Sequence, residues 1–107
     1  MSNNKKAVRN QFRNAVFKRD NYACRICGFQ STPEQAQTDL DAHHITNRNL
    51  MPNGGYVPEN GITLCKAKCH EEAEQGRPSP ESLYILIGSS KETAEKAAKA
   101  LDNIHLM

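Results

Sequence analysis

Residues 24–27, Cys-Arg-Ile-Cys, and residues 65–69, Cys-Lys-Ala-Lys-Cys, contain all four cysteines of the 107-residue chain. Two thiolates at such a spacing can bind one metal ion, and two pairs complete a tetrahedral Zn²⁺ site with the ligands Cys24, Cys27, Cys65 and Cys69. A site with four protein ligands keeps no open position for a substrate, so the predicted zinc ion is structural. The second pair has three intervening residues where two are usual.

The composition of the chain favours metal ligation over disulfide bonds. Only 37% of the residues are hydrophobic and Trp is absent, so the apolar core is small and needs further stabilisation. The first ten residues lack the apolar stretch of a secretory signal, and no apolar run is long enough to cross a membrane, so we expect a cytoplasmic protein without a membrane partner. Cytosolic cysteines seldom form disulfides, and ordinary buried or redox-active cysteines are the alternative to zinc.

The spacing of apolar residues and turn residues predicts short helices and strands. Val8, Phe12 and Val16 recur every fourth residue, so residues 5–18 are expected to form an amphipathic helix. Gly28 is expected to close a tight turn at the end of a first short strand. The expected strands are residues 22–28, 40–45 and 62–64.

The second half of the chain predicts a loop followed by helices. Residues 46–61 contain two Pro, three Gly and four Asn, a composition typical of a loop. Ser79 is the expected N-cap of one later helix, and Ser89 with Glu92 resembles the capping box of the last one. The expected helices are residues 66–75, 80–87 and 89–106. Three phenylalanines are assigned to the core: Phe12, Phe17 and Phe29. The last helix has an apolar face for packing: Ala94, Ala97, Ala98 and Leu101.

Three of the four histidines lie at two places, His43-His44 and His70. Adjacent histidines on a strand point to opposite faces, so one can bind a metal ion while the other faces a substrate. His70 directly follows Cys69 and could share a second metal ion with His43. Glu74 lies one helical turn after His70 and is a candidate third ligand, although a solvated acidic helix face is the alternative.

The charge of the chain is unevenly distributed. Residues 1–27 carry seven basic side chains and one acidic side chain, and residues 28–107 carry seven basic and eleven acidic ones. A basic N-terminal third indicates a partner with phosphate groups, and a solvated helix face is the alternative. The candidate nucleic-acid-binding residues are Arg9 and Arg13 in the first helix and Arg48 in the loop after His44.

Four segments in a fixed order resemble a known family. They are Arg19-Asp20-Asn21-Tyr22-x-Cys24-x-x-Cys27-Gly28, Ala42-His43-His44-Ile45, Gly54-Gly55-x-x-x-Glu59-Asn60-Gly61-Ile62-x-Leu64-Cys65, and Cys69-His70. Over about residues 9–75 the chain resembles an HNH homing-type nuclease domain. The resemblance implies a ββα-metal finger, in which two strands, a loop and a helix surround a catalytic divalent ion. Many members of this family also carry a four-cysteine zinc site.

The resemblance also implies a role for each matched residue. His44 matches the general base that takes a proton from the attacking water, and His43 and His70 match the metal ligands. Asn60 matches the residue that positions the loop and orients the base. The chemistry agrees with these roles, because a neutral imidazole with a pKa near 6.5 suits a base at neutral pH. A divalent ion with few protein ligands keeps positions open for phosphate oxygens.

These observations together predict an α+β fold. The expected single domain, residues 1–107, is a small, treble-clef-like ββα-metal domain held together by a structural zinc. It divides into a basic helix (5–18), the HNH core (19–75) and a C-terminal helical extension (79–107).

The predicted function is that of a metal-dependent endonuclease acting on DNA with Mg²⁺, Mn²⁺, Ni²⁺ or Zn²⁺, with a phage or mobile-element origin and a dimer or partner protein as possible contexts. The alternatives are a non-catalytic zinc-containing DNA-binding module and a purely structural zinc protein.

Overall fold

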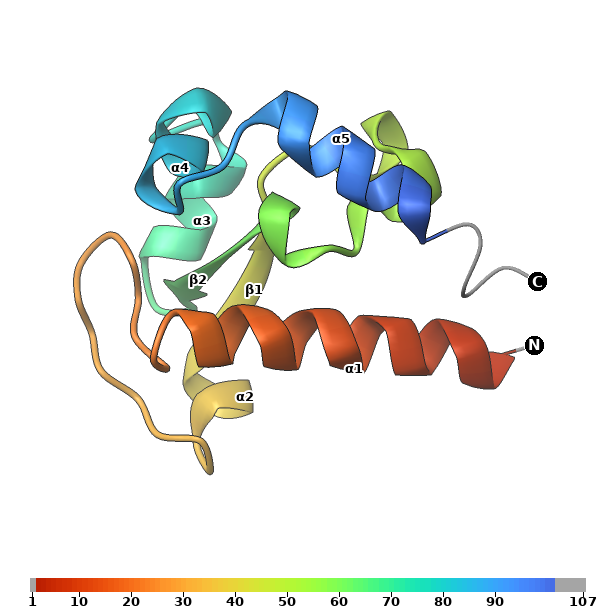
Figure 1. Cartoon of the computed structure of the whole chain (residues 1–107). Helices are drawn as coiled ribbons and strands as arrows, with labels where there is room; N and C mark the ends of the chain where they lie inside the picture. Colours follow the sequence, from red (N-terminus) through yellow and green to blue (C-terminus); the bar gives the residue numbers. More distant parts are fainter. Residues whose placement is uncertain (1, 102–107) are drawn as a thin grey trace.

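The computed structural model describes residues 2–101 and shows a two-stranded sheet surrounded by helices (Figure 1). The helices are α1 (Ser2–Arg19), α2 (Ala36–Asp39), α3 (Cys69–Glu74), α4 (Pro80–Leu86) and α5 (Lys91–Ala100). The strands are β1 (Leu40–His44) and β2 (Gly61–Cys65). Three short 3-10 helices, η1 (Arg48–Leu50), η2 (Pro52–Gly55) and η3 (Pro58–Asn60), lie between the strands. Among residues 2–101, none of the helices has the length and apolar character that a membrane crossing requires.

The two strands pair antiparallel and form the centre of the domain. Leu40 lies opposite Cys65 and His44 lies opposite Gly61. Helix α1 contacts both strands, and α3 follows β2 and packs against it. The order β1, β2, α3 is that of a ββα unit, so the predicted α+β class and the two central strands are confirmed.

The apolar core lies between the sheet and the surrounding helices. Phe17 of α1, Leu40 of β1 and Leu64 of β2 are nearly inaccessible to solvent. The predicted apolar face of α5 is confirmed, because Ala94 and Ala98 are fully buried. The assignment of Phe29 to the core is wrong: this side chain is 47% exposed, since it follows the turn that brings Cys24 and Cys27 together.

The predicted strand at residues 22–28 is also wrong. Only an isolated bridge between Ala23 and Gln30 forms, and Tyr22 has a positive φ of 59°. The N–H of Gly28 donates to the carbonyl of Cys24, which curls the backbone around the cysteine pair. An extended strand would point successive side chains to opposite faces, whereas this turn lets both thiols face one point.

Two helices begin later than predicted. The helix expected at 66–75 begins at Cys69, because residues 66–68 form the turn that spans the second cysteine pair. The N-cap of α5 is Ser90, whose hydroxyl accepts from the N–H of Thr93, and not Ser89. The hydroxyl of Ser89 donates instead to the carbonyl of Glu59. Ser79 caps α4 as predicted, and the part of the last helix expected at 102–106 lies outside the described residues.

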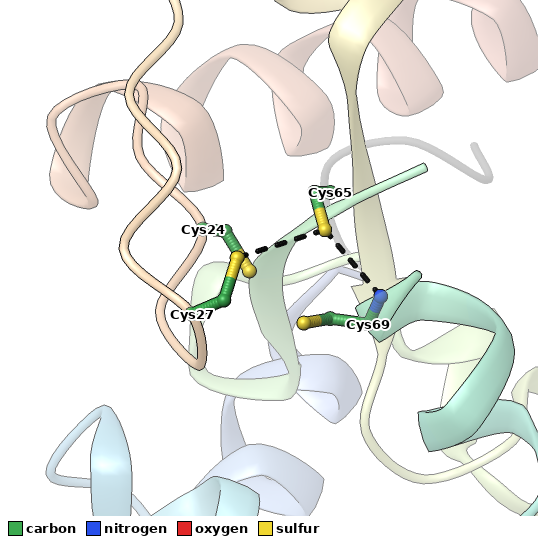
Figure 2. Close-up of side chains that lie close together, drawn as sticks. All are labelled: Cys24, Cys27, Cys65 and Cys69. Carbon is green, nitrogen blue, oxygen red and sulfur yellow. Dashed lines mark hydrogen bonds between the residues drawn. The ribbon is translucent and has the colours of Figure 1, made fainter. Parts of the chain in front are cut away.

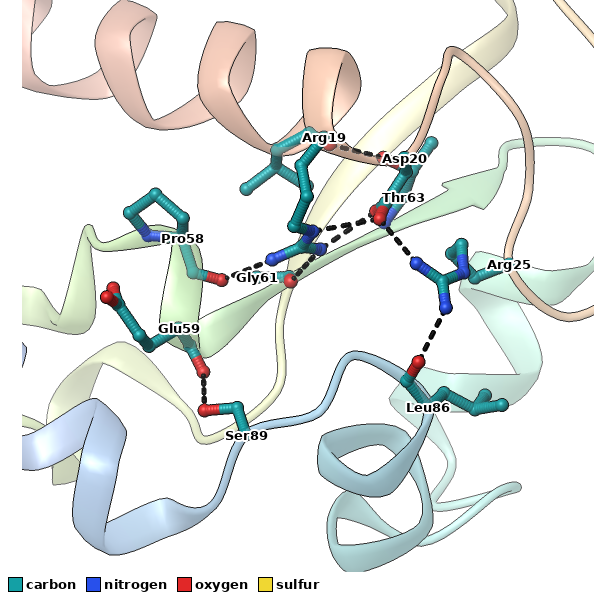
Figure 3. Close-up of polar contacts among 10 residues, drawn as sticks. Arg19, Asp20, Arg25, Pro58, Glu59, Gly61, Thr63, Leu86 and Ser89 are labelled. Carbon is teal, nitrogen blue, oxygen red and sulfur yellow. Dashed lines mark hydrogen bonds and ion pairs between the residues drawn. The ribbon is translucent and has the colours of Figure 1, made fainter.

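A buried carboxylate joins four parts of the fold (Figure 3). Asp20, at the end of α1, has a fully buried side chain and accepts from Arg19, from Arg25 and from the N–H of Thr63 in β2. Arg19 also donates to the carbonyls of Pro58 and Gly61. Arg25 reaches the carbonyl of Leu86 in α4. Asp20 therefore fixes α1, the first cysteine turn, β2 and the end of α4 relative to one another.

Candidate active site and metal centre

The four cysteine thiols meet at one point, between the first cysteine turn and the end of β2 (Figure 2). Their Sγ atoms all lie within 4.8 Å of one another, and Cys27 Sγ is 3.8 Å from Cys65 Sγ. Zinc–sulfur bonds of about 2.3 Å in a tetrahedron place sulfur atoms about 3.8 Å apart. All four cysteines are free thiols and not disulfides. The cluster is therefore consistent with a structural zinc, and the turn at residues 66–68 accommodates the extra residue of the second pair.

The environment of Cys24 favours metal binding, whereas burial and the neighbouring thiols raise the pKa of Cys69. Burial raises the pKa of Cys24, but the backbone N–H groups of Cys27, Cys65 and Ile26 outweigh it and bring the pKa down to about 7. A thiolate is the form that binds a metal ion, so Cys24 is available as a ligand near neutral pH. The N–H of Cys69 donates to Cys65 Sγ at 3.4 Å, which supports negative charge on that sulfur.

A second group of possible metal ligands lies on the face of β1 that looks toward α3. It consists of His43 on β1 and of His70 and Glu74 on successive turns of α3, with one ligand atom of each within 4.8 Å of the others. The ring centroids of His43 and His70 are 5.2 Å apart. Nε2 of His70 lies 3.7 Å from a carboxylate oxygen of Glu74. This set of two imidazoles and one carboxylate suits a divalent ion that keeps open positions.

Asp41 supports this group, although its role was not predicted from the sequence. Its Oδ2 accepts from Nδ1 of His70 at 2.7 Å, which leaves Nε2 of His70 facing Glu74. The same bond raises the pKa of His70. A carboxylate behind a metal-binding histidine fixes the ring and its tautomer. The alternation of side chains along β1 could have indicated Asp41, because Asp41 and His43 are two residues apart and share one face of the strand.

His44 lies on the opposite face of β1 and packs against α1. Its ring stacks on Phe12, with centroids 4.5 Å apart and planes at 26°, and it meets the edge of Tyr56 at 4.7 Å. Burial, with the positive charges of Arg48 and His43, lowers the pKa of His44 to about 4. Its Nε2 is buried without a hydrogen-bond partner among the described residues, so protonation there would place a charge where no acceptor lies. His44 is therefore a neutral imidazole at pH 7.

The three arginines proposed to bind nucleic acid occupy different environments. Arg48 is exposed, lines the same cleft as His44, and donates to the hydroxyl of Tyr56 at 2.8 Å. Arg9 is exposed on α1 and is not among the residues that line the cleft. Arg13 is half-buried and donates to Asn10 one turn earlier on α1. Only Arg48 therefore lies together with the histidines.

Asn60 is fully buried and connects the two ends of the loop between the strands. Its Oδ1 accepts from the N–H of Thr46 at 2.9 Å, and its Nδ2 donates to the carbonyls of Thr46 and Gly55. Gly55 has a φ of 65°, and a Cβ atom at this position would lie 2.6 Å from Asn60 Nδ2. Asn60 thus holds the backbone two residues after His44 and makes no hydrogen bond with His44 itself.

One open cleft of about 1130 Å³ brings these groups together. Residues that line it include His43, His44, Arg48, His70 and Glu74. A neutral imidazole, a group of candidate metal ligands and a guanidinium thus face the same solvent-filled space. Hydrolysis of a phosphodiester requires this combination, because a water must lose a proton while negative charge develops on phosphate oxygens.

Comparison with known proteins identifies the segment that carries this site. Residues 24–76 match the family model described as HNH endonuclease. No curated protein and no solved structure matches the chain. The matched residues run from the first cysteine pair through both strands to the end of α3, and they include the second cysteine pair, His43, His44, His70 and Asn60. Residues 24–76 of this chain are an HNH endonuclease domain.

Proposed function

We propose that this protein is a metal-dependent endonuclease that hydrolyses phosphodiester bonds in DNA. The observation that carries the proposal is the position of His44, which is held neutral at the cleft that also receives the His43, His70 and Glu74 ligand set. The HNH family supports a nuclease or nucleic-acid-binding role for residues 24–76.

His44 is the proposed general base. A neutral imidazole can accept a proton from water, and the lowered pKa of about 4 keeps it neutral over the physiological range. Its stacking on Phe12 and its edge contact with Tyr56 restrict the rotation of the ring. Both contacts therefore contribute to the orientation of the base.

His43, His70 and Glu74 are the proposed ligands of the catalytic ion, which would be Mg²⁺ or another divalent ion such as Mn²⁺, Ni²⁺ or Zn²⁺. When bound, such an ion acts as a Lewis acid on phosphate oxygens and on the leaving oxygen. Asp41 holds the ring of His70 with Nε2 toward Glu74. This group is separate from the four-cysteine cluster, so the proposal requires two ions with different functions.

Arg48 is the proposed contact to DNA phosphate inside the cleft. Its guanidinium is held at the hydroxyl of Tyr56, which in turn contacts His44, so one aromatic side chain orders both the cation and the base. The exposed side chains of Lys5 and Arg9 on α1 add positive charge outside the cleft. Contacts of this kind give salt-dependent affinity with little sequence preference.

A plasmid cleavage assay tests the proposal. Purified protein is compared in EDTA, Mg²⁺, Mn²⁺ and Ni²⁺, with His44→Gln as the variant that keeps a polar side chain of similar length without the base. We expect nicked or linear plasmid with a divalent ion, no product in EDTA, and no product from the variant at unchanged zinc content. Cleavage by His44→Gln at the wild-type rate would remove His44 as the base.

A non-catalytic DNA-binding module is the competing function. The cysteine cluster and the basic α1 do not depend on the histidines, so such a module would retain salt-sensitive DNA binding. Binding that weakens with salt, together with no cleavage in any of the three metals, would favour this alternative over the nuclease.

A further inference from the structure

Tyr84 on α4 lies outside the HNH match but hydrogen-bonds inside the loop that follows His44. Its hydroxyl donates to Asn60 Oδ1 at 2.7 Å and lies 2.6 Å from Thr46 Oγ1. Because the Tyr84 proton points to Asn60, the Thr46 hydroxyl is the donor in the second bond. The backbone N–H of Thr46 also donates to Asn60 Oδ1, so the three residues form a closed and buried triangle.

The triangle fixes the backbone between the proposed base and the proposed phosphate contact. Thr46 stands two residues after His44 and two residues before Arg48. Both lone pairs of Asn60 Oδ1 are used, one by the N–H of Thr46 and one by Tyr84. Tyr84 also lines the cleft, but it is only 4% exposed and both contacts of its hydroxyl are with protein, so its hydroxyl acts within the protein.

The C-terminal segment holds the same loop at two further points. Nδ2 of Asn53 in η2 donates to the carbonyl of Ala98 in α5 at 2.9 Å. The hydroxyl of Ser89 donates to the carbonyl of Glu59 in η3 at 2.9 Å. Figure 1 shows α5 lying along the loop between β1 and β2, and α5 contacts both η2 and η3. The beginning, middle and end of the loop are thus each tied to residues 84–98.

We propose that Tyr84 is a positioning residue for the loop between β1 and β2, which carries Thr46 and Arg48. We further propose that the segment after the HNH match holds this loop in place at the active site. This inference rests on the proposed nuclease function. Hydrogen bonds in a buried network reinforce one another, and loss of one hydroxyl leaves the other polar groups poorly satisfied. The loop would then sample other positions, and His44 and Arg48 would lose their relative placement.

Tyr84→Phe tests the inference, because it removes the hydroxyl and keeps the buried ring. We expect the single-turnover cleavage rate at saturating DNA to fall at least about tenfold, while the zinc content stays at the wild-type value and the Kd for DNA, to which the exposed Lys5 and Arg9 of α1 also contribute, changes less than the rate. Tyr22→Phe is the matched control, since Tyr22 is partly buried against the core and its hydroxyl has no hydrogen bond within residues 5–101. Wild-type cleavage by Tyr84→Phe would overturn the inference.

Variants of Thr46 separate positioning from a general loss of packing. Thr46→Val removes the Thr46 hydroxyl at nearly constant volume and breaks only its bond to Tyr84, so it should slow cleavage, but by no more than Tyr84→Phe does. This variant keeps the inference testable if Tyr84→Phe folds poorly. Thr46→Ser keeps the hydroxyl and should cleave at close to the wild-type rate. The double variant Tyr84→Phe/Thr46→Val should be no slower than Tyr84→Phe alone, because Tyr84→Phe already removes the hydrogen bond that Thr46→Val removes. Additive losses would contradict a shared network.

Amide hydrogen exchange at Thr46 tests the inference without catalysis. We expect about tenfold faster exchange of this amide in Tyr84→Phe and unchanged exchange of the Thr63 amide, which is bonded to Asp20. Unchanged protection at Thr46 would overturn the role of Tyr84 in ordering the loop. If the wild-type protein cleaves no DNA, the proposed function fails, and the exchange measurement alone decides whether Tyr84 holds the loop.

Discussion

The imidazole of His44 stacks on the ring of Phe12, with ring centroids 4.5 Å apart and an interplanar angle of 26°. Phe12 belongs to α1, which precedes the HNH match, while Tyr84 belongs to α4, which follows it. The proposed base is thus packed by a helix on one side of the match, and its loop is bonded by a helix on the other side. Both flanking segments contribute to the proposed active site.

Replacement of Phe12 by Leu should slow cleavage and lower the free energy of unfolding only slightly. Leucine keeps an apolar side chain under His44 but removes the flat surface that holds the imidazole, so we expect the single-turnover rate to fall about tenfold. The loss of unfolding free energy should be about 1 kcal/mol. Phe29→Leu is the matched control, because Phe29 is 47% exposed. Equal rates for the two variants would show that stacking does not orient the base.

The dependence of cleavage on pH should reflect the lowered pKa of His44. Burial, Arg48 and His43 bring this pKa to about 4, so the base stays neutral at pH 5.5, where an ordinary histidine is about nine-tenths protonated. At saturating metal we therefore expect the single-turnover rate to remain high from pH 7 to about pH 5 and to fall below that. A decline centred near pH 6.5 would contradict a buried, neutral base.

Arg48→Ala should shift the acidic limb of the same pH–rate profile. Removal of the Arg48 charge makes protonation of His44 less unfavourable, so the acidic limb should move to higher pH. Arg77→Ala is the control, since Arg77 is exposed and does not line the cleft. If the cleavage rate falls at the same pH in both arginine variants, the charge of Arg48 does not affect the pKa of His44.

Features that depend on neighbouring residues in the sequence could be predicted. The spacing of Cys24, Cys27, Cys65 and Cys69 predicted one cluster, and the structure brings the four thiols together. The strands 40–45 and 62–64 followed from apolar and β-branched residues between turn signals, and their observed bounds differ by at most one residue. Helix α4 followed from its Ser-Pro start, because a cap and its first turn lie within four residues.

Features that depend on tertiary contacts could not be predicted. Tyr56, Tyr84 and Phe12 act through residues that are distant in the chain, and their types alone indicate only a core or a loop position. The strand expected at 22–28 failed because the need for two thiols at one point overrides the β propensity of Tyr and Ile. Alternation along β1 could have placed Asp41 on the same face as His43. Its contact with His70, which follows 29 positions later, could not be predicted in this way.

Asp41→Asn should weaken metal binding at the histidine site. An amide stabilises the Nδ1–H tautomer of His70 less well than a carboxylate and allows the proton to move to Nε2, where an ion would bind. We expect Mn²⁺ affinity of the zinc-loaded protein, measured by calorimetry, to fall about 10- to 100-fold. Asp39→Asn is the control, because Asp39 accepts from Ser31 and not from a histidine. Unchanged affinity in Asp41→Asn would exclude the supporting role of this carboxylate.

Cys27→Ala should abolish the cooperative fold although the Cys27 side chain is exposed. Truncation of an exposed residue changes stability by less than about 0.5 kcal/mol, whereas loss of a structural zinc ligand removes binding free energy that stabilises the folded chain. We expect one zinc per chain in the wild-type protein by metal analysis, none in the variant, and no thermal unfolding transition by circular dichroism. Ile26→Ala, in the same turn and also exposed, should unfold as the wild type does. A normal transition in zinc-free Cys27→Ala would contradict a structural metal.

Asp20→Ala should strongly destabilise the fold, although Asp20 belongs to neither group of candidate metal ligands. The variant leaves Arg19 and Arg25 without their shared buried partner and the N–H of Thr63 without an acceptor (Figure 3), so we expect a loss of about 3 kcal/mol in unfolding free energy. Burial raises the pKa of Asp20, but the hydrogen bonds from Arg19 and Thr63 outweigh it and hold the pKa below its ordinary value. A carboxylate of this kind stabilises the fold above the ordinary aspartate pKa of about 3.9 and loses that effect only as pH falls through the lower folded-state value.

The difference between the wild type and Asp20→Ala should therefore be constant from pH 8 to pH 5. Urea unfolding at each pH measures it, with Glu34→Ala, an exposed carboxylate, as the control that should change stability by less than about 0.5 kcal/mol. A difference that shrinks between pH 8 and pH 5 would mean that Asp20 already takes up a proton there. If the two alanine variants are equally stable, the ion pairs of Asp20 only replace the hydration of the same groups in the unfolded chain. The four segments that meet at Asp20 would then be held together by apolar packing alone.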